Sequence, residues 1–293
     1  MSYFVLKITK NYDQYLLSDF LSSFYLSNDK IKYLLNNQCC FVNGVISKDV
    51  ILKTGDELCI DTGFYDVNEV LPVDTKIDIL YEDEYLLIVN KLPKCIIYPD
   101  DKNIDNTMAN YISNYYLKND LDYKVRHVHR LDYDTTGILV YAKDIITHAA
   151  LSKMIELGTF VRKYLAITEG KFDKKIGQVK ASIGKHRHQN NTMIVSKTGK
   201  TAITNYEVVD YQNNKSLVLL KLETGRTHQI RVHMSYIGHP LIGDAKYGSI
   251  INDERVLLHS YIVDFIHPMT NKKMHITCDM PNDFKKHLEN KKS

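Results

Sequence analysis

The sequence predicts an α+β fold whose central sheet is mixed and mostly antiparallel, preceded by a small N-terminal α/β module. In the larger part of the chain, expected strands outnumber expected helices and do not alternate regularly with them, which argues against a doubly wound fold. The length of 293 residues predicts two domains, at roughly 150 residues each. A content of 44% hydrophobic and 25% charged residues is typical of an ordinary folded protein.

The N-terminal module covers residues 1–62, and its sequence predicts two helices followed by a β-sheet. Apolar residues recur at helical spacing over 16–24, and Ser27 is placed to cap a second helix. Asn43-Gly44 is typical of a hairpin turn. The strands expected around and after this turn cover residues 40–42, 45–46 and 57–60.

An acidic, proline-containing segment over 63–75 shows no sustained period and predicts a linker. We expect the larger domain over 76–285 and a basic tail over 286–293. A capped amphipathic helix is predicted between Asp144 and Gly158. The other expected elements are a helix over 105–117 and strands over 77–81, 86–89, 137–142, 160–168, 204–209 and 217–223.

Positive charge is unevenly distributed along the chain. The net charge is zero over residues 1–60, −7 over 61–120 and +10 over 121–293, and all seven arginines lie at or beyond Arg126. In a chain that otherwise uses lysine, each arginine is a candidate for contact with a carboxylate or phosphate. The alternative for any one of them is a solvated surface cation.

The location of the protein is predicted from two absences in the sequence. No apolar run approaches the ~20 residues that cross a bilayer, and the five cysteines form no CxxC pair that would hold zinc or a redox disulfide. We therefore expect a soluble, cytoplasmic protein.

The densest polar cluster runs over residues 126–137, directly before an apolar strand. Two His, two Arg and two Asp within nine residues are too polar for a core strand, and loops of this kind commonly display a site. Asp132, close to Arg130, would be an ionised carboxylate that can act as a nucleophile or base.

A metal site would have to use His127, His129, His228 and His233. The neighbouring arginines would repel a divalent ion, and no Cys or Glu-x-x-His pattern completes a ligand set. The sequence therefore predicts no metal.

Two further clusters are also rich in functional side chains. Residues 222–233 carry Arg226 and Arg231, with Gly225 allowing close approach of the backbone. Residues 162–164 begin a strand and contain Tyr164, which in isolation would be a core residue.

Together the three clusters resemble the RluA family of pseudouridine synthases over about residues 76–280. The matching segments are His129-Arg130-Leu131-Asp132 with Thr135-Thr136-Gly137, Lys163-Tyr164 with Glu169-Gly170, residues 224–233, Gly243-Asp244, Tyr247-Gly248 and Leu257-Leu258-His259. Thr136 replaces the usual Ser. Residues 90–99 depart from the family's Asn-Lys-Pro motif, because the first Pro, a Gly and a His are missing.

The N-terminal module resembles an S4 RNA-binding domain through Ser27, Val42-Asn43-Gly44 and residues 53–56. It departs from that family at Asn28, where Arg is common, and in its zero net charge. The alternative is a small α/β appendage that makes no RNA contact.

The resemblance implies isomerisation of uridine to pseudouridine in structured RNA, with neither cofactor nor metal, by a monomer. It implies Asp132 as the nucleophile, Arg231 as its ion-pair partner and Tyr164 as the ring that stacks on the base. Arg130 would fill the space left by an extruded nucleotide. The other RNA-binding residues expected are His129, Lys163, Arg226, His228 and Lys53.

The expected substrate is 23S ribosomal RNA, with transfer RNA as the alternative. A protein that binds structured RNA without catalysis is a second hypothesis, disfavoured because a buried carboxylate would repel phosphate. A glycoside hydrolase built on Asp132 and Asp134 is the third.

Overall fold

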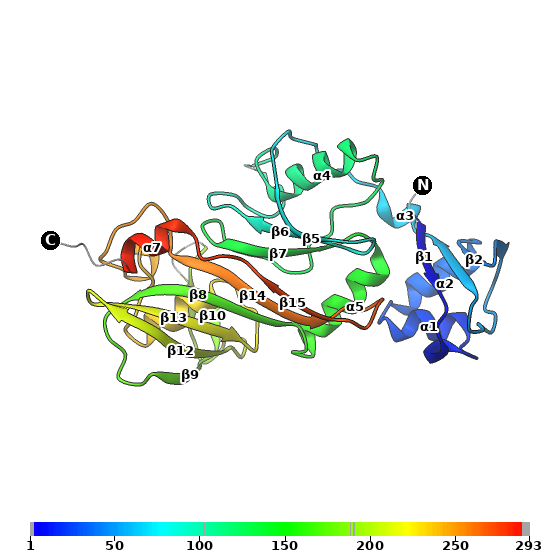
Figure 1. Cartoon of the computed structure of the whole chain (residues 1–293). Coiled ribbons are helices and arrows are strands. Elements are labelled where there is room, and N and C mark those ends of the chain that lie inside the picture. The colour runs from blue at the N-terminus through cyan, green and yellow to red at the C-terminus, as the bar shows by residue number, and fades with distance from the viewer. Residues whose placement is uncertain (1–2, 102, 188, 190, 289–293) are drawn as a thin grey trace.

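The structure, a computed structural model, describes every residue except 1–2, 102, 188, 190 and 289–293. It contains a small four-stranded sheet at the N-terminal end and a long nine-stranded sheet beside it (Figure 1). None of the helices described is both long and apolar enough to span a bilayer.

The described part of the N-terminal module contains the expected helices and hairpin. Ser27 occupies the N-cap position of the second helix, although its side chain makes no capping hydrogen bond. Asn43 and Gly44 both have positive φ, 51° and 78°, the conformation that a two-residue type I′ hairpin turn requires. The elements are β1 (Tyr3–Lys7), η1 (Lys10–Tyr12), α1 (Leu17–Ser23), α2 (Asn28–Asn36), β2 (Cys40–Val42), β3 (Val45–Ile46) and β4 (Glu57–Asp61).

The segment expected as a linker starts with a short helix, α3 (Gly63–Asp66). Asp66 forms an ion pair with Arg126, and both side chains are buried. Phe4 of the module packs against Tyr85 of the large domain, with ring centroids 5.9 Å apart. The module is therefore packed against the large domain and not merely tethered to it.

The large sheet is mixed and mostly antiparallel, as predicted. Its strand order is β5-β6-β7-β14-β8-β13-β12-β9, with β15 pairing β14, and only β7 and β14 are parallel. The strands are β5 (Asp78–Glu82), β6 (Leu86–Lys91), β7 (Thr136–Ala142), β8 (Val161–Glu169), β9 (Ile176–Lys180), β12 (Ile203–Gln212), β13 (Lys215–Leu222), β14 (Leu258–Ile266) and β15 (Lys273–Thr277).

The six predicted strands of this domain are confirmed, but β9, β14 and β15 were not predicted, and β14 lies between β7 and β8. This strand brings the start of β7 next to the start of β8. Gly137, with φ of 98°, faces β14 so closely that a Cβ would come 2.2 Å from the carbonyl oxygen of Ser260. No other residue fits at that crossing.

Two helices cover opposite faces of the β6–β7 pair. Helix α4 (Met108–Lys118) packs with Leu139 and Tyr141, whereas α5 (Ile145–Glu156) packs with Ile138 and Val140. Asp144 caps α5 as predicted, because its carboxylate accepts hydrogen bonds from the backbone of Ile146 and Thr147.

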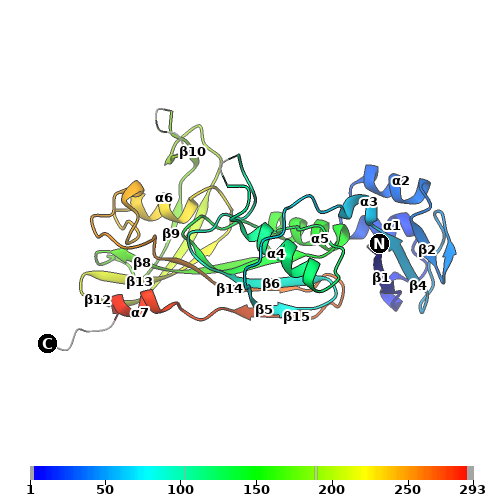
Figure 2. The ribbon, with the colours of Figure 1, turned by 90° about the horizontal axis from the view of Figure 1, so that it is seen from above.

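Helix α6 (Gln229–Tyr236) lies beside a hairpin of β10 (Ile183–Lys185) and β11 (Met193–Val195). Figure 2 shows this hairpin standing away from the large sheet. A short helix η2 (Ala245–Tyr247) follows α6, and α7 (Asn282–Leu288) includes the first residues of the predicted tail. Residues 289–293 of that tail lie outside the described residues.

Candidate active site

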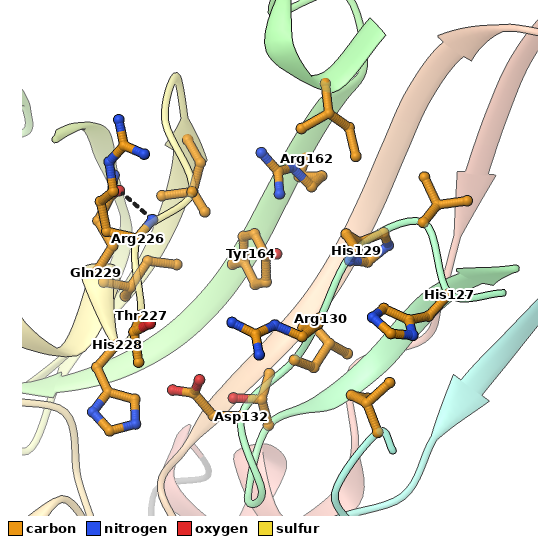
Figure 3. Close-up of a pocket in the computed structure, with 18 of the residues that line it drawn as sticks. His127, His129, Arg130, Asp132, Arg162, Tyr164, Arg226, Thr227, His228 and Gln229 are labelled. Atoms are coloured by element: carbon orange, nitrogen blue, oxygen red, sulfur yellow. Dashed lines mark hydrogen bonds between the residues drawn. The ribbon is translucent and has the colours of Figure 1, made fainter. Parts of the chain in front are cut away.

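The three polar clusters of the sequence meet around one cavity of about 1010 Å³. The cavity lies at the start of β7, beside β8 and the N-terminal end of α6 (Figure 3). The predicted site residues that line it are His129, Arg130, Asp132, Tyr164, Arg226, His228 and Arg231.

Asp132 is held by Arg231, whose Nη1 lies 3.4 Å from the carboxylate. The expected ion pair is present, but Arg231 has a closer partner that the sequence analysis did not identify. Its Nε and Nη2 donate to both carboxylate oxygens of Asp244 at 2.7 and 2.8 Å. Asp244 is therefore the residue that fixes the guanidinium in place.

Burial alone would lower the pKa of Arg231, but hydrogen bonds and the charge of Asp244 raise it above its usual value. The guanidinium also lies over the Tyr247 ring, 4.9 Å from its centroid. Arg231 therefore remains a cation that faces Asp132.

Lys91 anchors the other side of the Asp132 loop. Its side chain is fully buried, and Nζ donates to the carbonyl oxygens of Leu92, Tyr133 and Thr135, each at 2.9 Å. Burial lowers the pKa of Lys91 to about 8. The Lys91 that survives in the altered 90–99 motif thus holds the backbone immediately after Asp132.

Tyr164 lies in the middle of the cavity wall and is almost fully buried. Its pKa is raised mainly by burial, which is opposed by the positive charge of Arg162. Alternate residues of a strand face the same side, so Arg162 faces the cavity with Tyr164 and Lys163 faces away. Lys163 instead lies 3.5 Å from Asp264 and does not line the cavity.

His129 is buried three residues before Asp132, and both of its ring nitrogens are enclosed. Burial, reinforced by the charge of Arg162, lowers the pKa of His129 to about 3, so the ring is neutral at physiological pH. Because its nitrogens are enclosed, a direct contact of His129 with RNA stays a prediction.

The remaining lining residues lie closer to solvent. Arg130 is exposed at the rim, and Arg226 donates from Nε to the carbonyl oxygen of Thr201. His228 has φ of 55° at the start of α6, and its Nδ1 lies 2.7 Å from the hydroxyl of Tyr247. Burial lowers the pKa of His228, which favours the neutral ring.

Three residues considered in the sequence analysis lie elsewhere. Lys53 is exposed on the N-terminal module and does not line the cavity. His233 is buried, with its ring nitrogens bonded to Thr204 and Ala181, so it belongs to the core. Asp134 does not line the cavity either, which removes the paired carboxylates that a glycosidase would need.

The geometry of the cavity suits a reaction on a planar ring that binds inside it, away from solvent. One carboxylate faces the cavity beside a fixed cation, and a tyrosine ring offers a stacking surface. A carboxylate in this position can attack or stabilise an electron-poor carbon, while the ring holds a planar partner.

Known proteins similar to this chain share one activity in their names. The family described as RNA pseudouridylate synthase matches residues 85–236. The Bacillus subtilis protein "Uncharacterized RNA pseudouridine synthase YhcT" is 38% identical over 278 residues, covering 93% of this chain and 91% of that protein. "Ribosomal large subunit pseudouridine synthase D" of Vibrio parahaemolyticus is 32% identical over 274 residues, covering 88% and 84%.

A solved structure also resembles the fold. "Human RNA Pseudouridylate Synthase Domain Containing 1" superposes with a TM-score of 0.61 at 24% identity, covering 75% of this chain and 89% of that one. This likeness shows that the large domain has the same α+β architecture.

Proposed function

The chain belongs to the RNA pseudouridylate synthase family, and from this premise we propose that it isomerises uridines of large-subunit ribosomal RNA with Asp132 as the nucleophile. It is an RNA pseudouridine synthase, an isomerase. The finer assignment to ribosomal RNA is supported by relatives whose names specify the ribosomal large subunit.

The observation that carries the assignment of Asp132 is its place opposite Arg231 in a cavity walled by Tyr164. Uracil must leave C1′ of the ribose, turn and rejoin through C5. Asp132 supplies the carboxylate against the sugar or base, and Arg231, fixed by Asp244, orients that carboxylate. We propose no cofactor for this reaction.

Tyr164 and Arg130 are proposed to manage the extruded nucleotide. An enzyme that modifies a base must take it out of its stack, and an aromatic ring is the usual platform for the displaced base. Tyr164 offers that ring inside the cavity, while exposed Arg130 at the rim can occupy the vacated position in the RNA. Arg226 and His228 would contact the flanking nucleotides.

The N-terminal module is proposed to bind RNA as an S4-like domain, with Lys53 among its contacts. We keep the division into residues 1–62, a linker over 63–75 and a catalytic domain over 76–285 as part of this proposal. The packing of Phe4 on Tyr85 fixes the module beside the catalytic domain, as a second RNA contact requires. Cytoplasmic location and a monomeric state stay predictions.

The test is incubation of the protein with unmodified 23S ribosomal RNA and, separately, with transfer RNA. Pseudouridine is then mapped by carbodiimide treatment and primer extension. We expect new stops on 23S RNA with the wild-type protein and none with Asp132→Asn. Stops on transfer RNA alone would reassign the substrate, and binding without any stop would favour the non-catalytic hypothesis.

A further inference from the structure

One cation in the cavity has no role in the assignments above. Arg162 is only 7% exposed, yet it takes part in none of the ion pairs found between described residues. Its Nε is buried without a hydrogen-bond partner. The other arginines of the domain with largely buried side chains, Arg126, Arg231 and Arg255, are each paired with a carboxylate.

An unpaired buried guanidinium is unfavourable for folding. Removing a charge from water is costly unless a counter-charge and hydrogen bonds compensate. The cavity that Arg162 lines is the place from which such compensation can come. The arrangement is therefore typical of a residue whose anionic partner arrives with the substrate.

The position of Arg162 relative to Asp132 indicates which part of the substrate it meets. Figure 3 shows the two side chains on opposite sides of the Tyr164 ring. The guanidinium also lies against Gly225, where an added Cβ would be 3.4 Å from Nη1, so the loop before α6 leaves room for it. If Asp132 faces the sugar and Tyr164 stacks on the base, Arg162 faces the edge of the base remote from the sugar.

That edge of uracil becomes anionic during the reaction proposed above. When an oxygen of the Asp132 carboxylate bonds to C1′, the C1′–N1 bond breaks, its electron pair stays on the ring, and the negative charge spreads over N1, O2 and O4. The ring then turns about its N3–C6 axis until C5 faces C1′. A ring electron pair forms the C5–C1′ bond as the bond between C1′ and the Asp132 oxygen breaks and returns the carboxylate. C5 then loses its proton to solvent and N1 takes one up, so the product is an isomer.

This rotation exchanges the positions of O2 and O4. A donor fixed in the wall therefore meets a carbonyl oxygen both before and after the turn. We propose that Arg162 is a catalytic residue that donates hydrogen bonds to a uracil carbonyl oxygen and stabilises the released uracil anion. The proposal rests on the proposed function. It predicts that cytosine is rejected, because its amino group would meet Arg162 donor to donor.

A phosphate of the RNA backbone is the other anionic oxygen that Arg162 could hold. The backbone must run back out of the cavity to solvent, where exposed Arg130 lies. Arg162, by contrast, is enclosed beside His129 and Gly225. The enclosed position favours the base.

The experiment compares Arg162→Gln, Arg162→Lys and Lys221→Gln with the wild-type protein on a 23S RNA transcript labelled with [5-³H]uridine. Lys221 is exposed on β13 opposite Lys163, so its loss removes one positive charge on the face away from the cavity. Tritium release is measured in single turnover at saturating enzyme, and RNA affinity is measured at several salt concentrations. Thermal unfolding verifies that each variant is folded.

We expect Arg162→Gln to lower the saturating rate by about 100-fold or more, as loss of a preorganised donor to a developing anion does. RNA affinity and its salt slope should change little, Arg162→Lys should recover part of the rate, and Lys221→Gln should behave as wild type. A normal saturating rate with weaker binding and a salt slope reduced by about one would assign Arg162 to phosphate and overturn the proposal. An inactive wild-type protein would instead refute the proposed function.

Discussion

Replacement of Asp244 by Asn tests whether Asp244 holds the guanidinium that faces the nucleophile. The side chains of Asp244 and Arg231 are only 1% and 11% exposed, and two short hydrogen bonds join them. Removal of one member of such a pair leaves an uncompensated buried charge, which costs about 3–5 kcal/mol. At about 2–4 °C per kcal/mol for a domain of this size, Tm should fall by roughly 6–20 °C.

The assay is calorimetric unfolding of Asp244→Asn, Arg231→Met and the double variant. Each single change should be strongly destabilising, whereas the double variant should cost less than the sum because neither member of the buried Arg231–Asp244 pair is left charged without the other. Asp132→Asn is the matched control, because the Asp132 side chain is 28% exposed and lies 3.4 Å from Arg231. The Tm of Asp132→Asn should stay close to that of the wild-type protein. At about 2–4 °C per kcal/mol, a change in Tm of less than about 2 °C for Asp244→Asn would mean a loss of at most about 1 kcal/mol, and it would refute this account of the site.

Three further predictions follow from the same structure. Asp132→Asn should abolish tritium release while leaving RNA affinity nearly unchanged, because an amide neither attacks nor carries charge; turnover at a tenth of the wild-type rate would exclude the nucleophile assignment. The pKa of His129 is about 3 in the folded protein and near 6.5 in the unfolded chain. As pH falls below 6.5, only the unfolded chain takes up this proton, and the free energy of unfolding therefore decreases. At pH 5 the free energy of unfolding should be about 2 kcal/mol lower for this reason. The fall in Tm between pH 7 and pH 5 should therefore be smaller in His129→Gln than in the wild-type protein, and equal falls in the two proteins would contradict the burial argument. Deletion of residues 1–62 should leave a folded, active domain that binds long structured RNA more weakly, and unchanged affinity across a salt titration would favour the appendage interpretation.

Local patterns predicted much of this molecule because they depend on neighbours in the chain. The Asn43-Gly44 turn and the Asp144 cap are set by backbone conformation and hydrogen bonds within a few residues, and both are present. The placement of β14 between β7 and β8 depends on pairs of residues such as Leu258 with Ala166 and His259 with Thr136, which lie far apart in the chain, so no local periodicity reveals it.

In the site, too, some residues could be predicted from the sequence and others only from the tertiary structure. The resemblance to the pseudouridine synthases selected Asp132, Tyr164 and Arg231, and the structure brings them to one cavity. Strand alternation alone would have selected Arg162 over Lys163, because Tyr164 faces inward two residues later. The role of Asp244 required the tertiary structure, since only the fold shows which carboxylate reaches Arg231 with two oxygens.

The position of β14 also sets when the active site can exist during protein synthesis. The loop that carries Asp132 and the strand that carries Tyr164 do not pair with each other; each pairs with β14, at Thr136 and at Tyr164 itself. A nascent chain that ends at residue 257 contains the three matching motifs but not the strand that unites them. We therefore expect a nascent chain to be inert until β14 has emerged from the ribosome, which delays any action on the proposed ribosomal RNA substrate.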